Sequence, residues 1–484
     1  MQKNIYEKKN NSLFFFANLI IIFLIFILIL FTLFASYKIY IRGGFISSNL
    51  FYFYFILFAS IFIFLNSWIL RLKNNFKIYF VIIIVSIGFS LYSFELYMIV
   101  YGNKFAKIPD WNEERIVRAN QSNIEFDLRN RVEVINDFKK NNIFINPEIH
   151  PVVYLRTDEY INGIEFDKNF FFPLGSISNS QTLSCNEDGQ WLIYDTDKFG
   201  FNNPKKSYSN NAVDIAILGD SFAKGWCVKS DKNIGAHLRK KNLNVLNYGI
   251  AGSGPLLQYA AFKEYVEPIK PKIVIWFYFM NDLYDMIDEI RSPLLNKYLS
   301  NNDFSQKLMD NQIFIDAALK KLINNELQNY DKRLDSIVKR AAFYDFIKLS
   351  NTRSLFSLIP KSTKIEDIIK THLNIFKKTQ QNIDEWGGSL YVVYLPSIHQ
   401  VDKKNTFKSI PLEYKTDLYK EDVEQNIKSL NISYLNMKEE VFDNHFDPLS
   451  LFPFRIEGHY NDEGYRLVSE KIIERLIKDN KVAN

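Results

Sequence analysis

Hydrophobic positions are distributed unevenly along the 484-residue chain. The first hundred residues are dominated by Phe, Ile, Leu and Tyr, with long apolar stretches at about 13–37, 50–70 and 78–101. Each approaches the roughly 20 residues that a helix needs to cross the hydrocarbon core of a bilayer. We therefore predict a membrane anchor of three transmembrane helices over residues 1–101. A signal peptide is the alternative for the first stretch, but its apolar core is longer than the usual span of about 7–15 residues.

Basic residues flank these stretches, and because Lys and Arg concentrate on the cytoplasmic side of membrane proteins, they predict the direction of each crossing. With the N-terminus inside, the inner flanks hold six basic residues and the outer flanks hold four. We therefore expect a multi-pass protein of the cytoplasmic (inner) membrane, with its C-terminal domain on the periplasmic or extracytoplasmic side. Glu95, within the third stretch, is expected to lie near the interface or to face the other helices. The inner flanks carry Lys3, Lys8, Lys9, Arg71, Lys73 and Lys77, and the outer flanks carry Lys38, Arg42, Lys104 and Lys107.

After residue 101 the pattern changes to that of a water-soluble protein. Residues 102–210 combine a charged, helix-like start with short apolar pieces among Gly, Asn, Asp and Ser, and we interpret them as a stem and membrane-proximal segment. From residue 211 to 484, short apolar runs alternate with helix-like stretches, which is typical of a parallel sheet with helices on both faces. Residues from about 283 to 386 have helical spacing and no strong strand, so we predict a helical insertion that forms either a lid or a docking surface. The apolar runs lie at 214–218, 244–248, 272–279, 390–395 and 432–435.

Charge and cysteine content narrow the range of functions. Lys and Arg number 59 and Asp and Glu 54, so the formal net charge is only +5, and no basic block stands out beyond the membrane flanks. This distribution gives no indication of nucleic-acid binding. The two cysteines, Cys185 and Cys227, either form a disulfide in an oxidising compartment or remain two buried free thiols. The acidic turn around His445 lacks a second histidine at ligand spacing, so we expect no metal, and we expect no other cofactor.

Ser221 ends an apolar run in ILGDSF and is the first candidate for chemistry. A side chain that directly follows a strand of an open α/β sheet lies at the carboxyl edge, where such sheets bind ligands. A serine nucleophile needs a base, usually a histidine, and hydrogen-bond donors for the oxyanion that develops on the attacked carbonyl. Later segments supply these groups: Gly252 in NYGIAGSGP, Asn281 in WFYFMND and His459 in EGHYNDEGY.

Together the four segments resemble the sequence blocks of the SGNH (GDSL-type) hydrolases. The resemblance covers about residues 211–478 and implies a flavodoxin-like, three-layer α/β hydrolase domain that here carries a helical insertion. It implies Ser221 as the nucleophile, His459 as the base, and an oxyanion hole made by Ser221, Gly252 and Asn281. The chain is similar in particular to membrane-anchored polysaccharide O-acetyl esterases and acetyltransferases of this superfamily.

Two positions depart from the pattern of the family. Its third block usually reads Gly-x-Asn-Asp, but Phe279 stands at the glycine position. Its fifth block usually has Asp three residues before the histidine, where this chain has Ile456. Glu457, two residues before His459, resembles the Asp-x-His spacing of alginate O-acetyltransferase-like members, so we predict that Glu457 orients the imidazole. A Ser-His dyad with a backbone acceptor is the alternative.

The resemblance implies a membrane-tethered serine esterase, acyl hydrolase or O-acyltransferase. It would act through an acyl-enzyme on ester groups, O-acetyl above all, of cell-envelope or secreted glycans. Its partners are then the acylated glycan, or another ester, and the membrane; a transferase also needs a multi-span membrane protein to supply acyl groups. Two alternatives remain open from the sequence: a lipid esterase, and a catalytically inactive SGNH-fold module for glycan binding or assembly, which Phe279 and Ile456 favour.

Overall fold

The computed structural model describes residues 2–41, 50–101, 111–155, 160–208, 212–355, 365–402, 419–456 and 458–483. The chain divides into two compact units. The helical unit comprises residues 1–106 and 335–363, and the α/β unit comprises residues 107–334 and 364–484. The predicted insertion at 283–386 is therefore shared between the two units.

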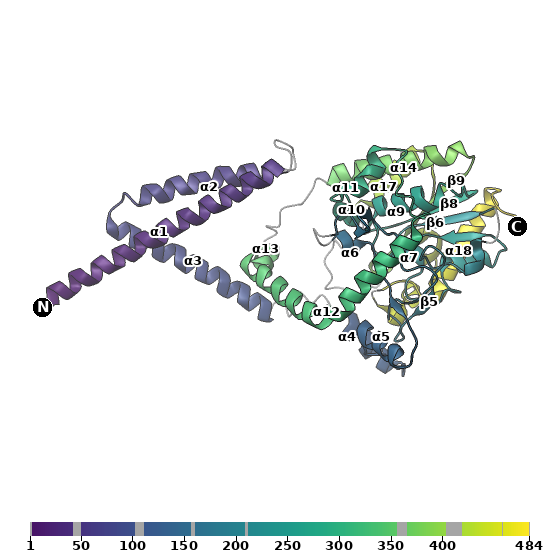
Figure 1. The fold of residues 1–484 in the computed structure, drawn as a ribbon, viewed down its shortest axis with the longest axis horizontal. Coiled ribbons are helices and arrows are strands. Elements are labelled where there is room, and N and C mark those ends of the chain that lie inside the picture. The colour runs from purple at the N-terminus through teal and green to yellow at the C-terminus, as the bar shows by residue number, and fades with distance from the viewer. Residues whose placement is uncertain are drawn as a thin grey trace. The chain divides into compact units, whose positions relative to one another are not determined.

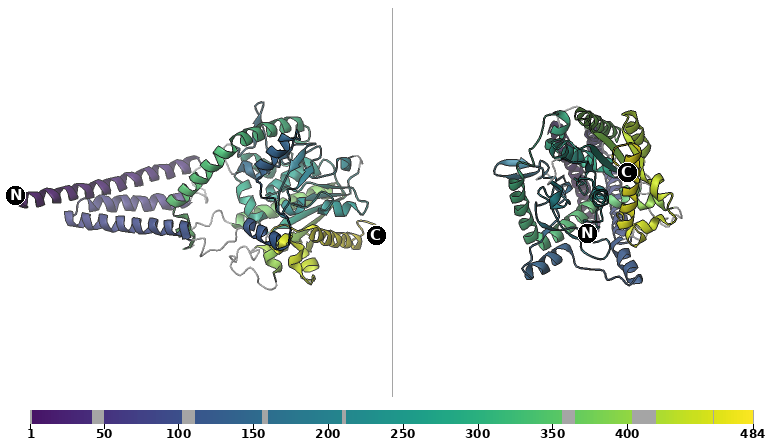
Figure 2. Two further views of the ribbon diagram at one scale, coloured as in Figure 1. Left: turned by 90° about the horizontal axis from the view of Figure 1, so that it is seen from below. Right: turned by 90° about the vertical axis from the view of Figure 1, so that its right-hand side faces the viewer.

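The helical unit contains the three predicted apolar helices (Figure 2), of which the first packs against both the second and the third. The candidate membrane spans are 26, 18 and 26 residues long, with mean hydropathies of 3.2, 1.8 and 1.9. These lengths and compositions suffice to cross a bilayer, which confirms the prediction of three such helices. The helices are α1 (Gln2–Ile41), α2 (Leu50–Ile69) and α3 (Asn74–Tyr101), and the spans within them are Ser12–Tyr37, Tyr52–Ile69 and Asn74–Ile99.

Glu95 of α3 is buried and binds a helix of the insertion. Its carboxylate accepts hydrogen bonds from the backbone N–H of Thr352, at 2.8 Å, and from the hydroxyl of Thr352, at 2.6 Å. Thr352 belongs to α13 (Ser350–Leu355), which packs against α3. A buried carboxylate needs such donors, because burying it without partners is costly. Helix α13 of the insertion is thus bound to α3 within the helical unit.

The α/β unit is built on a five-stranded parallel sheet with the strand order β10-β9-β8-β6-β7. Counted along the chain, this is the 2-1-3-4-5 order of flavodoxin-like folds read from the opposite edge. Strand β6, which lies between β8 and β7, is apolar throughout and fully buried, as a strand covered on both faces must be. The strands are β6 (Ile215–Leu218), β7 (Val245–Asn247), β8 (Ile273–Phe279), β9 (Ser389–Leu395) and β10 (Ser433–Asn436).

Helices cover both faces of this sheet (Figure 1). Because side chains alternate along a strand, Ala216 and Leu218 of β6 belong to one apolar core, and Ile215 and Ile217 belong to the other. The three-layer α/β prediction is confirmed. On one face lie α9 (Pro255–Ala261), α10 (Asp282–Glu289), α11 (Pro293–Ser300), the first part of α12 (Gln312–Ile347), α14 (Ile365–Glu385) and α17 (Lys420–Ser429); on the other lie α7 (Ser221–Lys224), α8 (Ile234–Arg239), α15 (Ile398–Val401) and α18 (Asp462–Lys478).

The segment before the sheet forms part of the α/β unit and adds two small sheets. One pairs β1 with β4 and β4 with β5, and the other is the hairpin of β2 and β3. The loop between β4 and β5 supplies a side chain of the candidate active site described below. The elements are α4 (Trp111–Gln121), α5 (Arg131–Lys140), β1 (Asn146–Pro147), α6 (Val152–Leu155), β2 (Ile164–Phe166), β3 (Asn169–Phe171), β4 (Gln181–Leu183) and β5 (Ile193–Asp195).

Candidate active site

The strand order brings the predicted site loops together. Strand β6 lies between β8 and β7, so the loop after β6 is flanked by the loops that follow those two strands. Ser221 is the first residue of α7, directly after the turn of Gly219 and Asp220. The N–H of Ile250, in the loop after β7, donates to the carbonyl of Gly219 at 2.9 Å. Asp220 caps α7 by accepting from the N–H of Phe222 at 2.9 Å, which fixes the start of the helix.

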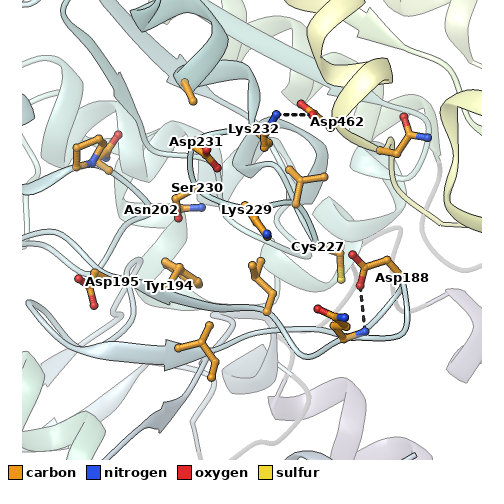
Figure 3. Close-up of a pocket in the computed structure, with 18 of the residues that line it drawn as sticks. Asp188, Tyr194, Asp195, Asn202, Cys227, Lys229, Ser230, Asp231, Lys232 and Asp462 are labelled. Atoms are coloured by element: carbon orange, nitrogen blue, oxygen red, sulfur yellow. Dashed lines mark hydrogen bonds and ion pairs between the residues drawn. The ribbon is translucent and has the colours of Figure 1, made fainter. Parts of the chain in front are cut away.

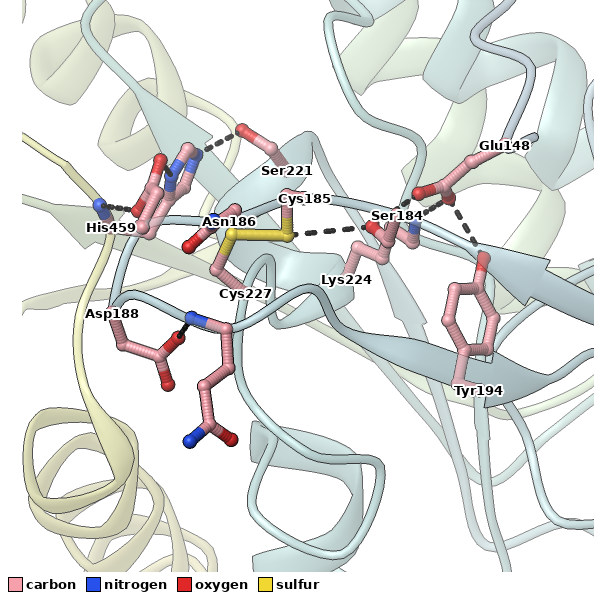
Figure 4. The surroundings of a disulfide bond; sticks show 12 residues. Glu148, Ser184, Cys185, Asn186, Asp188, Tyr194, Ser221, Lys224, Cys227 and His459 are labelled. Atoms are coloured by element: carbon pink, nitrogen blue, oxygen red, sulfur yellow. Dashed lines mark hydrogen bonds and ion pairs between the residues drawn. A yellow bond between two sulfur atoms is a disulfide. The ribbon is translucent and has the colours of Figure 1, made fainter. Parts of the chain in front are cut away.

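A chain of hydrogen bonds runs from Ser221 through His459 to Glu187. The Oγ of Ser221 lies 2.7 Å from Nε2 of His459 (Figure 4). On the other side of the ring, Nδ1 lies 3.0 Å from Oε1 of Glu187. The second oxygen of Glu187 accepts from the backbone N–H of His459 at 3.0 Å. Serine, histidine and carboxylate therefore have the geometry of a Ser-His-acid triad.

The charge of Glu187 determines which nitrogen of His459 carries the proton. Burial raises the pKa of Glu187, but the neighbouring His459 and Arg115 outweigh burial and hold this pKa below its ordinary value. An ionised carboxylate can only accept hydrogen bonds, so Nδ1 of His459 must donate to it. The lone pair of Nε2 then faces Ser221 and can accept its proton, which is the tautomer that a general base requires.

Glu187 is the carboxylate that sequence reasoning missed. Glu457, which we predict from the motif, lies outside the described residues, and the described partner of Nδ1 is Glu187. Ile456, at the family's aspartate position, is completely buried in the apolar core behind the sheet. That position serves packing, and the carboxylate comes from a loop that lies 272 positions from His459 in sequence.

Helix α4 supports this arrangement. Arg115 places Nη2 3.7 Å from Oε1 of Glu187, and both side chains are only 11% exposed. Arg118, one turn further, donates to the carbonyl of Phe454 at 3.0 Å and so fixes the segment that leads to the histidine. Gly458 lies close to both side chains, since a Cβ there would lie 3.0 Å from Oε2 of Glu187 and 3.2 Å from Nη2 of Arg115.

The predicted oxyanion loop after β7 is held by a buried acid. Gly252 has φ +69°, a backbone conformation that favours glycine, and a Cβ there would lie 3.1 Å from Val152. Glu289 of α10 accepts from the N–H of Gly254 at 2.5 Å and from the N–H of Leu256 at 2.9 Å. These bonds satisfy the start of α9 and fix the loop that presents the N–H of Gly252.

Asn281 lies at the start of α10, after β8. Its Nδ2 donates to Asp285 at 2.8 Å, which engages one of the two N–H groups of the amide. Phe279, the departure from the family's glycine, stacks on Phe222 with ring centroids 4.2 Å apart. Phe222 in turn packs 4.5 Å from the ring of His459. Phe279 therefore supports the wall beside the imidazole.

Two buried acids lie beneath the nucleophile. Burial raises the pKa of Asp220 to about 6, while His459 and the N–H groups of α7 act in the opposite direction. Burial raises the pKa of Asp282 as well, and repulsion from Asp220 raises it further. Ionising Asp220 therefore costs stability in the folded protein.

We expect Asp220→Asn to stabilise the protein at pH 8 but not at pH 4. Since the folded pKa of Asp220 lies above the unfolded value of 3.8, its protonated form is favoured by folding, and this stabilisation is lost as the pH rises from about 4 to above 6. Asn retains the capping oxygen without the charge, so the gain at pH 8 is up to about 3 kcal/mol. Thermal unfolding of wild type and variant at both pH values measures the gain. An equal difference in Tm at pH 4 and pH 8 would contradict the role of the charge.

The structure pairs Cys185 with Cys227, with their Cα atoms 5.6 Å apart. Beside this disulfide lies a groove of about 1460 Å³, lined by the hairpin of β4 and β5 and by the segment after α7. Asp188 and Cys227 contribute to its wall, and the ion pair of Lys232 with Asp462 lies at 2.8 Å on its far side (Figure 3). The groove thus lies next to the loop of the triad carboxylate, while the triad serine and histidine do not line it.

The chain is similar to several solved structures. A lipolytic protein of the G-D-S-L family from Desulfitobacterium hafniense DCB-2 is 15% identical with a TM-score of 0.29, over 54% of this chain and 98% of that protein. An acetyl xylan esterase is 12% identical with a TM-score of 0.31, over 55% and 100% of the two chains. A two-domain esterase active on acetylated mannans is 14% identical with a TM-score of 0.30; the match covers 57% of this chain and about half, 51%, of that esterase.

No family model matches the sequence. No curated protein matches it either.

Proposed function

We propose that the protein is a membrane-tethered serine ester hydrolase or O-acyltransferase of the SGNH superfamily. The hydrogen-bonded chain from Ser221 through His459 to Glu187 carries the proposal. A serine hydroxyl is a weak nucleophile, and this arrangement supplies the base that activates it and the charge that stabilises the resulting imidazolium.

The proposed reaction proceeds through an acyl-enzyme. Oγ of Ser221 attacks the ester carbonyl while Nε2 of His459 takes the hydroxyl proton and Glu187 stabilises the imidazolium. The oxyanion accepts hydrogen bonds from the N–H groups of Ser221 and Gly252 and from the amide of Asn281. The imidazolium then protonates the departing alkoxide. Water, in a hydrolase, or a sugar hydroxyl, in a transferase, attacks the acyl-enzyme with His459 again acting as base.

The proposed substrate is an acylated glycan of the cell envelope or a secreted glycan, with O-acetyl as the favoured ester. The groove beside the site supports the proposal of a hydroxyl-rich polymer as substrate. Its lining combines carboxylates, lysines and amides, which are side chains that hydrogen-bond to sugar hydroxyls. An ester of a membrane lipid is the alternative, since three apolar helices would tether the enzyme to a bilayer.

The proposed location is the outer side of the cytoplasmic membrane, with the N-terminus inside. The basic residues in the flanks support this orientation. The pairing of Cys185 with Cys227 supports it as well, because disulfides persist in oxidising compartments and are rare in the cytosol.

The inactive glycan-binding module is disfavoured by the intact triad. In the sequence, Phe279 and Ile456 favour the inactive module. In the structure, however, Phe279 stacks on Phe222 beside the imidazole, and Ile456 is part of the apolar core. The carboxylate that bonds to His459 is supplied by Glu187. A protein that only binds glycans has no need of a buried, charged carboxylate behind a histidine, because burying that charge is costly.

Labelling of the full-length, detergent-solubilised protein with a fluorophosphonate probe tests the proposal. We expect wild type to be labelled at about pH 8, where an ordinary imidazole is neutral. Ser221→Ala should not be labelled, because the atom that bonds to phosphorus is gone. Release of acetate from an acetylated oligosaccharide, compared with release of fatty acid from a phospholipid, then identifies the substrate class. A folded wild type that remains unlabelled and releases neither product would refute the proposal.

A further inference from the structure

The loop that carries Glu187 lies outside the five-stranded sheet. Beyond the paired residues of β4 and β5, the N–H of Ser184 donates to the carbonyl of Leu192, and the N–H of Leu192 donates to the carbonyl of Cys185, both at 2.9 Å. Pairing of the two strands therefore ends at Cys185, and Glu187 follows two residues later. The position of the carboxylate depends on what holds this loop.

The disulfide joins this loop to the segment that carries the nucleophile (Figure 4). Glu187 and Ser221 are 34 positions apart along the chain. Through the disulfide they are much closer, because Glu187 is two residues from Cys185 and Cys227 is six residues from Ser221. The N–H of Trp226, next to Cys227, donates to the carbonyl of Ser221 at 3.0 Å, so the anchor point is itself fixed to the nucleophile.

The carboxylate of Glu187 must be held firmly because it is a charged group that is buried from water. Only 8% of the residue is exposed. Attraction to His459, at 3.0 Å, and to Arg115, at 3.7 Å, offsets the free-energy cost of burying this charge. This attraction is lost if the carboxylate moves away from the two side chains. A loop free to move would allow water to compete for the carboxylate and would lose the orientation of the imidazole.

We infer that the disulfide of Cys185 and Cys227 is a positioning element of the active site, which holds Glu187 against His459 and makes full activity depend on the oxidised state of the cysteines. This inference rests on the proposed function. It assigns the disulfide a role in catalysis beyond stability, and it means that the enzyme reaches its full rate only where the disulfide can form.

A second link keeps the hairpin in place when the disulfide is absent. Glu148 accepts from the hydroxyl of Ser184 at 2.5 Å and from the hydroxyl of Tyr194 at 2.8 Å. The same carboxylate is paired with Lys224, the last residue of α7. This buried network joins hairpin and nucleophile helix without sulfur, so we expect variants without the cysteines to fold and to lose chiefly the alignment of the loop.

The test compares the full-length wild type with Cys185→Ser/Cys227→Ser, using p-nitrophenyl acetate as substrate. We expect kcat to fall about tenfold to a hundredfold with KM changed less than about twofold, the cost of a small misplacement of a positioning group. In a Glu187→Gln background, removing the cysteines should change kcat less than about twofold, because the group that the disulfide positions is already gone. Val468→Ala, which leaves a cavity in the core at α18, is the control for a loss of stability without loss of the disulfide.

Reduction of the wild type should reproduce the effect. Dithiothreitol gives two electrons and two protons to the disulfide, which becomes two thiols, while the reagent closes into its own cyclic disulfide. Proton NMR supplies a readout that needs no turnover: the low-field resonance of the proton between His459 and Glu187 should be present in wild type and weakened by loss of the cysteines.

Each outcome decides one of the two ideas. Unchanged kcat and an unchanged resonance in the folded double variant would overturn the inference while leaving the esterase proposal intact. A wild type without turnover or labelling would overturn the esterase proposal, and the resonance would still report whether the disulfide positions Glu187. Additive effects of Glu187→Gln and of the cysteine substitutions on kcat would also overturn the inference, because they would show that the disulfide acts independently of Glu187.

Discussion

Replacing His459 with alanine is expected to lower kcat for ester hydrolysis by about 10⁵- to 10⁶-fold, about as much as replacing Ser221. Nε2 of His459 lies 2.7 Å from Oγ of Ser221, whereas the carboxylate of Asp220 accepts from the same hydroxyl at the longer distance of 3.5 Å. Without the imidazole, the hydroxyl keeps its proton and the leaving alkoxide finds no acid. Serine and histidine act as one unit, so the double substitution should cost hardly more than either single one.

The measurement is the single-turnover rate with p-nitrophenyl acetate, with fluorophosphonate labelling as a second readout. His445→Ala is the matched control: its ring accepts from the N–H of Asp447 at 3.1 Å within its own turn, and we expect its rate to stay within about twofold of wild type. Added imidazole should restore part of the rate of His459→Ala, because it can enter the space left by the side chain. A rate for His459→Ala above about 1% of wild type would show that another group serves as base.

The parts of the fold that could be predicted from sequence are those with strong hydrophobic periodicity. The long apolar stretches became α1, α2 and α3, and the short apolar runs became the strands of the parallel sheet. The strands of a parallel sheet that is covered on both faces are apolar throughout, so a short continuous apolar run is typical of such a strand. The loops that follow β6, β7 and β8 meet for the same reason, so order along the chain sufficed to group Ser221 with the segments of Gly252 and Asn281.

The carboxylate of the triad could not be found by local spacing. The motif points to the residues just before His459, where Ile456 is buried in the core and Glu457 lies outside the described residues. Glu187 comes from a hairpin loop that joins the site only through tertiary contacts. One signal was present: if Cys185 pairs with Cys227, the residues next to Cys185 must lie near the nucleophile's helix, and Glu187 is among them.

The insertion shows a different limit of sequence patterns. Helical spacing predicted its helices but could not indicate what they pack against. Helix α14 completes a layer of the α/β unit, whereas α13 binds Glu95 in the helical unit. Both segments have the same helical character, and only burial against a particular partner distinguishes them. The contacts of α13 are internal to the chain, so the lid and the docking surface both stay predictions.

Replacing Glu187 with glutamine is expected to lower kcat by about 10³- to 10⁴-fold, with KM nearly unchanged. Glutamine has almost the same shape, but its amide can donate to Nδ1 of His459 and so favour the tautomer whose Nε2 carries a proton and cannot accept one from Ser221. It also removes the negative charge that stabilises the imidazolium and that faces Arg115 at 3.7 Å. Glu187→Asp should recover part of the rate, because it restores the charge, although at a greater distance. A purely structural role of Glu187 would not predict this recovery.

Glu457→Gln is the matched control, and steady-state kinetics of the three variants decide which acid serves the histidine. A large loss of kcat in Glu457→Gln together with a small loss in Glu187→Gln would return the role to the residue that the motif indicates.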